Sequence, residues 1–219
     1  YPSGKIFSNY GIKKIGKSLY KGITIFRVPI IPRFSANKFQ LVINYASYAF
    51  SASIFGALFL RRHKFDVIFV YEPSPITVGI PAILIKKIKK IPIVFWVQDL
   101  WPESILAVSA TKSNILIKFT DKLVRWIYSH CDEILVQSKG FVKEIKSKGV
   151  SKNKIKYLPN WAEDFYKPLK ANAKSSIAKS LKDENFKILF AGNLGEAQSL
   201  NTIISAADLI RNEKITWII

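Results

Sequence analysis

The 219 residues of the chain include no methionine, one cysteine and two histidines. A single cysteine, Cys131, excludes an intrachain disulfide and a cysteine-ligated metal cluster, and it favours a reducing compartment. With only His63 and His130 available, a histidine-rich metal site is not expected either. The residues therefore predict neither a cysteine-based nor a histidine-rich metal site.

The missing initiator methionine and both chain ends suggest a piece of a longer protein. The chain opens on Tyr1-Pro2-Ser3-Gly4, which is typical of a loop. It stops in Ile215-Thr216-Trp217-Ile218-Ile219, a β-branched and aromatic run typical of a strand interior. We interpret both ends as cuts.

Acidic residues are scarce. The chain has 15 Asp and Glu against 34 Lys and Arg, a formal net charge of +19. Such an excess predicts an anionic partner, which could be nucleic acid, the inner leaflet of a membrane or a phosphorylated small molecule. Genome composition explains many lysines but not the few acids. A hydrophobic share of 49% predicts a folded core.

Short apolar runs alternate with longer helical stretches, which predicts an α/β fold with a parallel sheet. A change of pattern within 159–187, followed by a new strand, glycine-containing turn and helix, predicts two domains, 1–168 and 169–219. The expected strands are 23–28, 67–71, 93–97, 133–136, 155–158, 188–191 and 215–219, and the expected helices are 38–62, 77–87, 113–128, 138–148 and 201–211.

The stretch from Phe39 to Leu60 has no charged residue and is followed by Arg61-Arg62-His63-Lys64, so its length and flank resemble a membrane span. Its polar residues share one helical stripe, however, and a strand is expected on either side. We predict a crossover helix with part of its apolar face against lipid, and a span is the alternative. The stripe consists of Gln40, Asn44, Ser47 and Ser51.

Two loops follow expected strands at the sheet edge where α/β proteins bind ligands. The first, residues 98–104, carries Asp99, Trp101 and Glu103. A carboxylate there can orient or deprotonate a hydroxyl, and an indole can stack on a sugar ring. The same residues equally suit a plain helix start, with Pro102 in its first turn.

The second loop, residues 192–200, lies between a strand and a helix. Backbone N–H groups and the helix dipole make such a turn an anion site. Gly192 and Gly195 match neither the dinucleotide fingerprint nor a P-loop, and a tight turn needs glycine without any ligand. The loop alone therefore leaves both interpretations open.

Four segments occur together in the order and spacing of family 4 glycosyltransferases: residues 96–104 (WVQDLWPES), 136–141 (VQSKGF), 158–162 (LPNWA) and 190–198 (FAGNLGEAQ). The chain resembles the branch that assembles bacterial surface polysaccharides such as O-antigen and capsule, including fucosamine transferases. The resemblance implies two Rossmann-like domains in the glycosyltransferase-B architecture, the N-terminal one incomplete and the C-terminal one only begun. It implies retaining transfer of a sugar from a nucleotide-sugar, without metal or cofactor.

The resemblance also assigns residues. Asp99 takes the catalytic position near the acceptor hydroxyl in the N-terminal domain. The remaining acceptor-side residues are Trp101, Glu103, Glu72, Ser138 and Asn160. The residues expected at the donor pyrophosphate are Gly192, Asn193, Gly195, Glu196 and Gln198.

The chain departs from the family in the donor loop. Asn193 and Gln198 stand where many members carry Arg and Lys, so backbone N–H groups and the helix end must stabilise the leaving charge. The family's first glycine-rich loop and its paired-glutamate motif are absent from the chain. The fragment alone is therefore expected to be inactive.

The expected partners are a nucleotide-sugar (UDP- rather than GDP-linked), a polyprenyl-diphosphate-linked saccharide acceptor and an anionic membrane surface. The expected activity is of the hexosyltransferase type, and the location is peripheral on the inner face of the plasma membrane. Nucleic acid is not expected, because the basic residues are scattered and match no binding motif. The alternatives are a sugar-nucleotide epimerase and a non-catalytic membrane-associated protein. The lysines expected at the membrane are Lys13, Lys14, Lys17, Lys21, Lys86, Lys87, Lys89 and Lys90.

Overall fold

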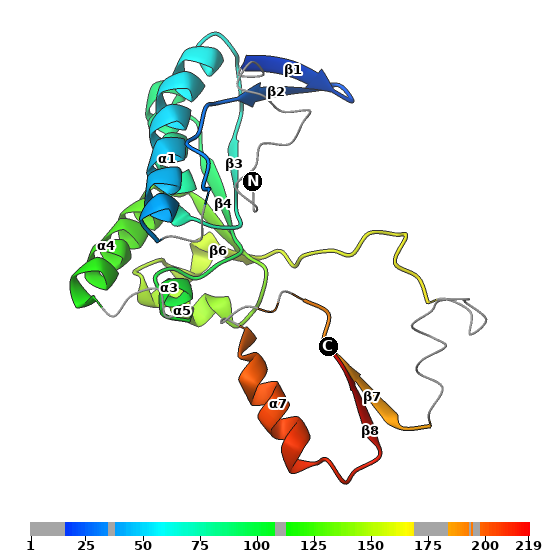
Figure 1. Ribbon diagram of the computed structural model, residues 1–219. Coiled ribbons are helices and arrows are strands. Elements are labelled where there is room, and N and C mark those ends of the chain that lie inside the picture. The colour runs from blue at the N-terminus through cyan, green and yellow to red at the C-terminus, as the bar shows by residue number, and fades with distance from the viewer. Residues whose placement is uncertain (1–15, 35–37, 108–112, 169–183, 193, 195–197) are drawn as a thin grey trace. The chain divides into compact units, whose positions relative to one another are not determined.

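The computed structural model describes residues 16–34, 38–107, 113–168, 184–192, 194 and 198–219 (Figure 1). Its internal contacts divide the chain into two compact units. Nearly all of the chain as far as Asn160 belongs to the first, and the second runs from Trp161 to the end. Whether these units are the acceptor and donor domains stays a prediction.

The first unit is built on a four-stranded parallel sheet in the order β3-β4-β5-β6. Phe95 lies beside Val70 on one neighbouring strand and Ile134 on the other. Phe95 and Ile134 are fully buried. The predicted α/β class with a Rossmann-like parallel sheet is confirmed. The strands are β3 (Ile68–Glu72), β4 (Ile93–Val97), β5 (Glu133–Val136) and β6 (Ile155–Tyr157).

Helices cover one face of this sheet. Each strand lies next to the one before it in the chain, always on the same side, and the connections between parallel strands all have the same handedness. Val124 and Ile127 of α4 are fully buried against it, and Leu116 N–H donates to the N-cap Ser113 Oγ at 3.4 Å. A Cβ on Gly79 would lie 2.5 Å from Ile127 Cγ2, so only glycine allows α2 this close to α4. The elements are η2 (Ile76–Val78), α2 (Gly79–Lys89), α3 (Glu103–Ala107), α4 (Asn114–His130), α5 (Phe141–Ser147) and η3 (Lys152–Lys154).

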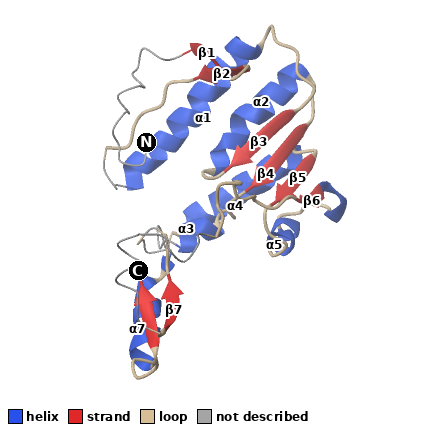
Figure 2. Ribbon diagram, turned by 90° about the vertical axis from the view of Figure 1, so that its right-hand side faces the viewer, coloured by secondary structure: helices blue, strands red, loops and turns tan. Residues whose placement is uncertain are grey.

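Helix α1 (Lys38–Leu60) lies beside α2 (Figure 2). The polar stripe predicted on it faces the extended segment that precedes it. Asn44 Nδ2 donates to Ile31 O at 2.6 Å, Ile31 N–H donates to Ser47 Oγ at 2.9 Å, and Phe34 N–H donates to Gln40 Oε1 at 3.0 Å. The stripe therefore holds residues 31–34 against the helix. By length and composition alone, α1 could cross a membrane, which is weak evidence for a span.

The strand expected at 23–28 does not join the parallel sheet. As β2 (Ile23–Arg27) it pairs antiparallel with β1 (Gly16–Tyr20), a strand that the sequence pattern did not predict. Lys21 and Gly22 link the two strands with positive φ angles of 47° and 83°, as a two-residue hairpin turn requires. The crossover prediction for α1 was therefore wrong, since α1 connects the hairpin to the sheet and not two strands of the sheet.

The second unit contains a parallel strand pair, β7 (Phe186–Leu189) and β8 (Ile215–Ile218), joined by α7 (Leu200–Leu209). Ile188 lies beside Trp217 in its register. This strand, helix and strand follow the predicted order.

Candidate functional site

Glu72, Asp99 and Trp101 come together where two adjacent strands of the sheet end. Glu72 is the last residue of β3, and Asp99 follows β4 by two residues. The Gln98 N–H group donates to Glu72 O at 3.1 Å and carries the strand pairing into the loop. The rule that parallel strands end at one sheet edge thus brings these three predicted residues to one place.

Glu72 is a fully buried carboxyl group. Burial raises its pKa to about 8, and the neighbouring Asp99 charge adds to the rise. Backbone N–H groups of Asp99 and Gln98 and the Trp101 indole lie near enough to oppose it, yet neither carboxyl oxygen has a hydrogen bond of standard geometry within the described structure. At neutral pH Glu72 is therefore an uncharged acid beneath the Asp99 loop.

Asp99 is half-buried, and this burial raises the pKa of its carboxyl group. The Ser74 side chain lies within hydrogen-bonding reach and opposes the rise. Ser74 has a φ of 133°, a strained value for a residue with a side chain, which the surrounding structure must hold in place. This conformation places the Ser74 hydroxyl group beside the Asp99 carboxylate.

Tyr45 reaches this group from α1. Burial raises the pKa of its phenol, while the Ser74 side chain and the Arg33 charge oppose the rise and the Asp99 charge adds to it. The Tyr45 and Trp101 rings meet edge to face, with centroids 6.5 Å apart. Sequence reasoning missed Tyr45, Ser74 and Arg33. The Ser-Pro pair after β3 was a usable signal for Ser74, but no sequence signal indicated the other two.

Asn160 lies at the same sheet edge and is exposed. Its Nδ2 donates to Gln98 Oε1 at 2.8 Å, so it is joined to the loop that carries Asp99. Ser138 follows the neighbouring strand β5, and its Oγ accepts the Gly140 N–H at 3.3 Å. Ser138 thereby stabilises the turn before α5, and its predicted acceptor role stays a prediction.

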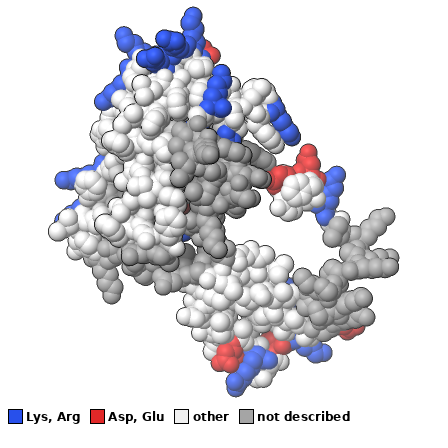
Figure 3. Space-filling view, turned by 45° about the horizontal axis from the view of Figure 1, so that its top comes forward, with Lys and Arg blue, Asp and Glu red and all other residues white. Residues whose placement is uncertain are grey.

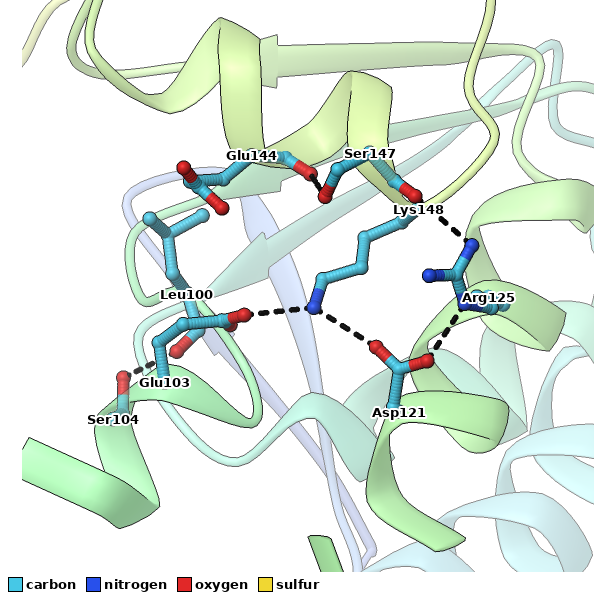
Figure 4. Close-up of polar contacts among 8 residues, drawn as sticks. All are labelled: Leu100, Glu103, Ser104, Asp121, Arg125, Glu144, Ser147 and Lys148. Carbon is cyan, nitrogen blue, oxygen red and sulfur yellow. Dashed lines mark hydrogen bonds and ion pairs between the residues drawn. The ribbon is translucent and has the colours of Figure 1, made fainter. Parts of the chain in front are cut away.

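The carboxylate of Glu103 takes part in an ion-pair network (Figure 4). Lys148 Nζ lies 2.7 Å from Glu103 Oε1 and 2.9 Å from Asp121 Oδ1, and Arg125 Nε lies 2.7 Å from Asp121 Oδ2. Burial alone would raise the pKa of Asp121, but its hydrogen bonds to Lys148 and Arg125 lower it. The network joins α3, α4 and the end of α5, so the geometry favours the helix-start interpretation for Glu103.

The donor loop is described in part. Gly192 follows β7, and Gln198 precedes α7, so both lie between the strand and the helix as predicted. No side chain forms a cap hydrogen bond with the first turn of α7 within the described segments. Asn193, Gly195 and Glu196 lie outside the described residues. Also within the described chain, no group of three His, Cys, Asp or Glu residues could hold a metal ion.

Residues 19–161 match the family of the glycosyl transferase 4-like domain. This is most of the chain, and the chain belongs to that family. The resemblance to family 4 glycosyltransferases is thereby confirmed.

Two curated relatives share this similarity. One is WcaI of Escherichia coli (strain K12), named as a candidate glycosyl transferase of colanic acid biosynthesis, which is 25% identical over 100% of this chain and 54% of its own length. The other is WbjE of Pseudomonas aeruginosa, named as a candidate glycosyltransferase, which is 24% identical over 83% of this chain and 46% of its own. The chain spans about half the length of these relatives.

Proposed function

We propose that the natural protein transfers a sugar from a nucleotide-sugar to a saccharide hydroxyl in the biosynthesis of a bacterial surface polysaccharide. The observation that carries this is the half-buried Asp99 carboxylate at the strand ends, with Ser74 and Tyr45 beside it, in a chain of the glycosyl transferase 4-like family. The names of the two relatives support the class of product.

Asp99 is suited to an acceptor hydroxyl. Partial burial strengthens the hydrogen bond that its carboxylate accepts, because less water competes for it. Its raised pKa makes it a better proton acceptor than an exposed aspartate. Uncharged Glu72 behind it adds no second negative charge. Asp99 therefore orients the acceptor hydroxyl and draws on its proton as the new bond forms.

The donor side rests on the strand, turn and helix of the second unit. Negative charge grows on the nucleotide diphosphate as it leaves the sugar, and free N–H groups at a helix start stabilise such charge. The N-terminus of α7, which follows Gln198, is our proposed binding point for this diphosphate. Retention of configuration, a hexosyl group and a UDP-linked donor complete the proposal, and none of the steps uses a metal.

A polyprenyl-diphosphate-linked acceptor would place the protein on the inner face of the plasma membrane. The net charge of +19 supports this placement. In the predicted lysine cluster, however, Lys86 Nζ lies 2.6 Å from Asp132 Oδ2, and Lys89 donates to Arg61 O at 2.6 Å. Lys87 and Lys90 are exposed and have no partner in the described part of the chain, so these two are the cluster's available charges.

Transfer of label from UDP- and GDP-sugars into a lipid extract tests this function with the natural full-length protein. Label that enters the organic phase only with active protein, and from one donor, supports a lipid-directed glycosyltransferase. Isomerised nucleotide-sugar without transfer would establish the epimerase in its place. Vesicle binding without either reaction would establish a non-catalytic membrane protein.

A further inference from the structure

Helix α1 carries its large apolar side chains on the outside. Every fourth residue from Val42 to Ile54 is exposed and apolar: Val42, Ala46, Phe50 and Ile54, which together form the apolar face of α1. Phe50 is 70% exposed and Val42 58%. The 22 residues from Phe39 to Leu60 include no charged side chain, and the four side chains of this face carry no polar group.

The polar side of α1 is used internally. Gln40, Asn44 and Ser47 bond to the backbone of the extended segment that precedes the helix, and Ser51 is buried. Turning the apolar face inward would break these bonds and leave buried polar groups unpaired. In the described chain these bonds fix the polar side of α1 inward and leave the apolar face exposed.

The same bonds argue against a membrane span. A helix that crossed the bilayer would carry segment 31–34, with the charged Arg33, into hydrocarbon, which is costly. Gly56 also faces α2, because a Cβ added to it would lie 3.6 Å from Ile85 Cδ1, so α1 is packed sideways on that helix. A helix with one packed side and one apolar side suits a position in the plane of the interface.

Basic side chains gather at the C-terminal end of α1. Arg61, Arg62 and Lys64 follow the helix directly and are exposed. Phe26 of β2 stacks on Phe59 with ring centroids 5.6 Å apart, which places the base of the hairpin at the same end. Figure 3 shows Lys and Arg side chains collected at one end of the first unit. Such positive charge beside an apolar face complements anionic lipid headgroups.

We propose that α1 lies flat in the interface of an anionic bilayer, with its apolar face toward the acyl chains and Arg61, Arg62 and Lys64 at lipid phosphates. From Val42 to Ile54 this contact extends about 18 Å at 1.5 Å per residue. This deepens the membrane part of the proposed function and rests on it. Tyr45, on the same helix, contacts the Trp101 ring, so the Asp99 site lies beside the bilayer, within reach of a lipid-linked acceptor.

Sedimentation with vesicles of phosphatidylcholine, alone or with phosphatidylglycerol, tests the contact in the full chain. Phe50→Asp should weaken binding to the mixed vesicles about tenfold or more. The substitution removes an aromatic ring that the proposal buries in lipid, and it adds a negative charge that the anionic headgroups repel. Phe165→Asp is the matched control, since Phe165 is 73% exposed in the segment after the first unit, and it should bind like the unaltered chain. Equal binding of Phe50→Asp and the unaltered chain would overturn the proposal, and so would equal binding to both kinds of vesicle.

A polarity-sensitive thiol probe distinguishes a flat helix from a span. Cys131 is 2% exposed, so a thiol introduced by Val42→Cys, Phe50→Cys or Ile54→Cys is the one that reacts in the folded chain. A flat helix predicts the same shallow depth at all three positions, and steadily changing depth would establish a span instead. Neither assay requires sugar transfer. Failure of the unaltered protein to bind vesicles, with intact transfer to a soluble acceptor, would refute this contact alone, whereas intact binding without transfer would refute the enzymatic proposal.

Discussion

The buried carboxyl group of Glu72 predicts an unusual dependence of stability on pH. In the unfolded chain this group loses its proton near pH 4.5, whereas in the folded chain it keeps the proton to about pH 8. Between these two pH values the folded state keeps a proton that the unfolded state has released. The free energy of unfolding therefore falls as pH rises. At about 1.4 kcal/mol per pH unit, the loss reaches about 3 kcal/mol by pH 7 and about 5 kcal/mol above pH 8.

Glu72→Gln removes this titration with little change in shape. The variant should gain stability relative to the unaltered chain between pH 4.5 and 8, by about 3 kcal/mol at pH 7 compared with their difference at pH 4. Urea unfolding followed by tryptophan fluorescence across this range measures the gain. Glu133→Gln, an exposed carboxylate at the start of β5, is the control and should follow the unaltered chain. Parallel curves for Glu72→Gln and the unaltered chain would refute the buried neutral acid.

Three further predictions concern a close helix contact, the ion-pair network and the buried thiol. Gly79→Ala should lower stability by about 1–3 kcal/mol because its Cβ meets Ile127, while Gly56→Ala, with ordinary contact distances, should not; thermal unfolding compares them. Lys148→Met should cost about 1–2 kcal/mol at pH 7 because it removes the cation shared by Glu103 and Asp121 and leaves Asp121 with Arg125 alone, and this cost should shrink below pH 4 as Asp121 takes a proton; a loss that stays constant with pH would argue against the network. Cys131, with its pKa raised to about 12, should resist thiol reagents until urea unfolds the chain, and rapid labelling of folded protein would contradict its burial.

The central sheet could be predicted because its strands are continuous apolar runs. The strands 93–97 and 133–136 were placed to the residue, since Pro92 or Asp132 precedes each strand and a polar glutamine follows it. The β1–β2 hairpin was missed because its turn, Lys21-Gly22, is a weak signal and its first strand mixes lysine with glycine. The sequence also does not state which sheet a strand joins, since that depends on contacts distant in the chain.

The site was partly predictable for the same reason. Asp99 and Trp101 follow a strand directly, so the parallel-sheet rule placed them at the sheet edge. Tyr45 reaches that edge from a helix over fifty residues earlier in the chain, and only the packing of α1 shows this. Glu103 was left between two interpretations because its partner Lys148 lies on another element, and no local pattern indicates that pair.

Sugar transfer by an Asp99→Asn variant of the natural full-length protein tests whether the Asp99 carboxylate acts on the acceptor hydroxyl. Asp66→Asn is the matched control, because Asp66 is an exposed aspartate before β3, at the opposite edge of the sheet. We predict at least a hundredfold loss of transfer for Asp99→Asn, which is about 3 kcal/mol of barrier, with folding and vesicle binding unchanged and the control fully active. Near-normal transfer by Asp99→Asn would contradict this role of Asp99.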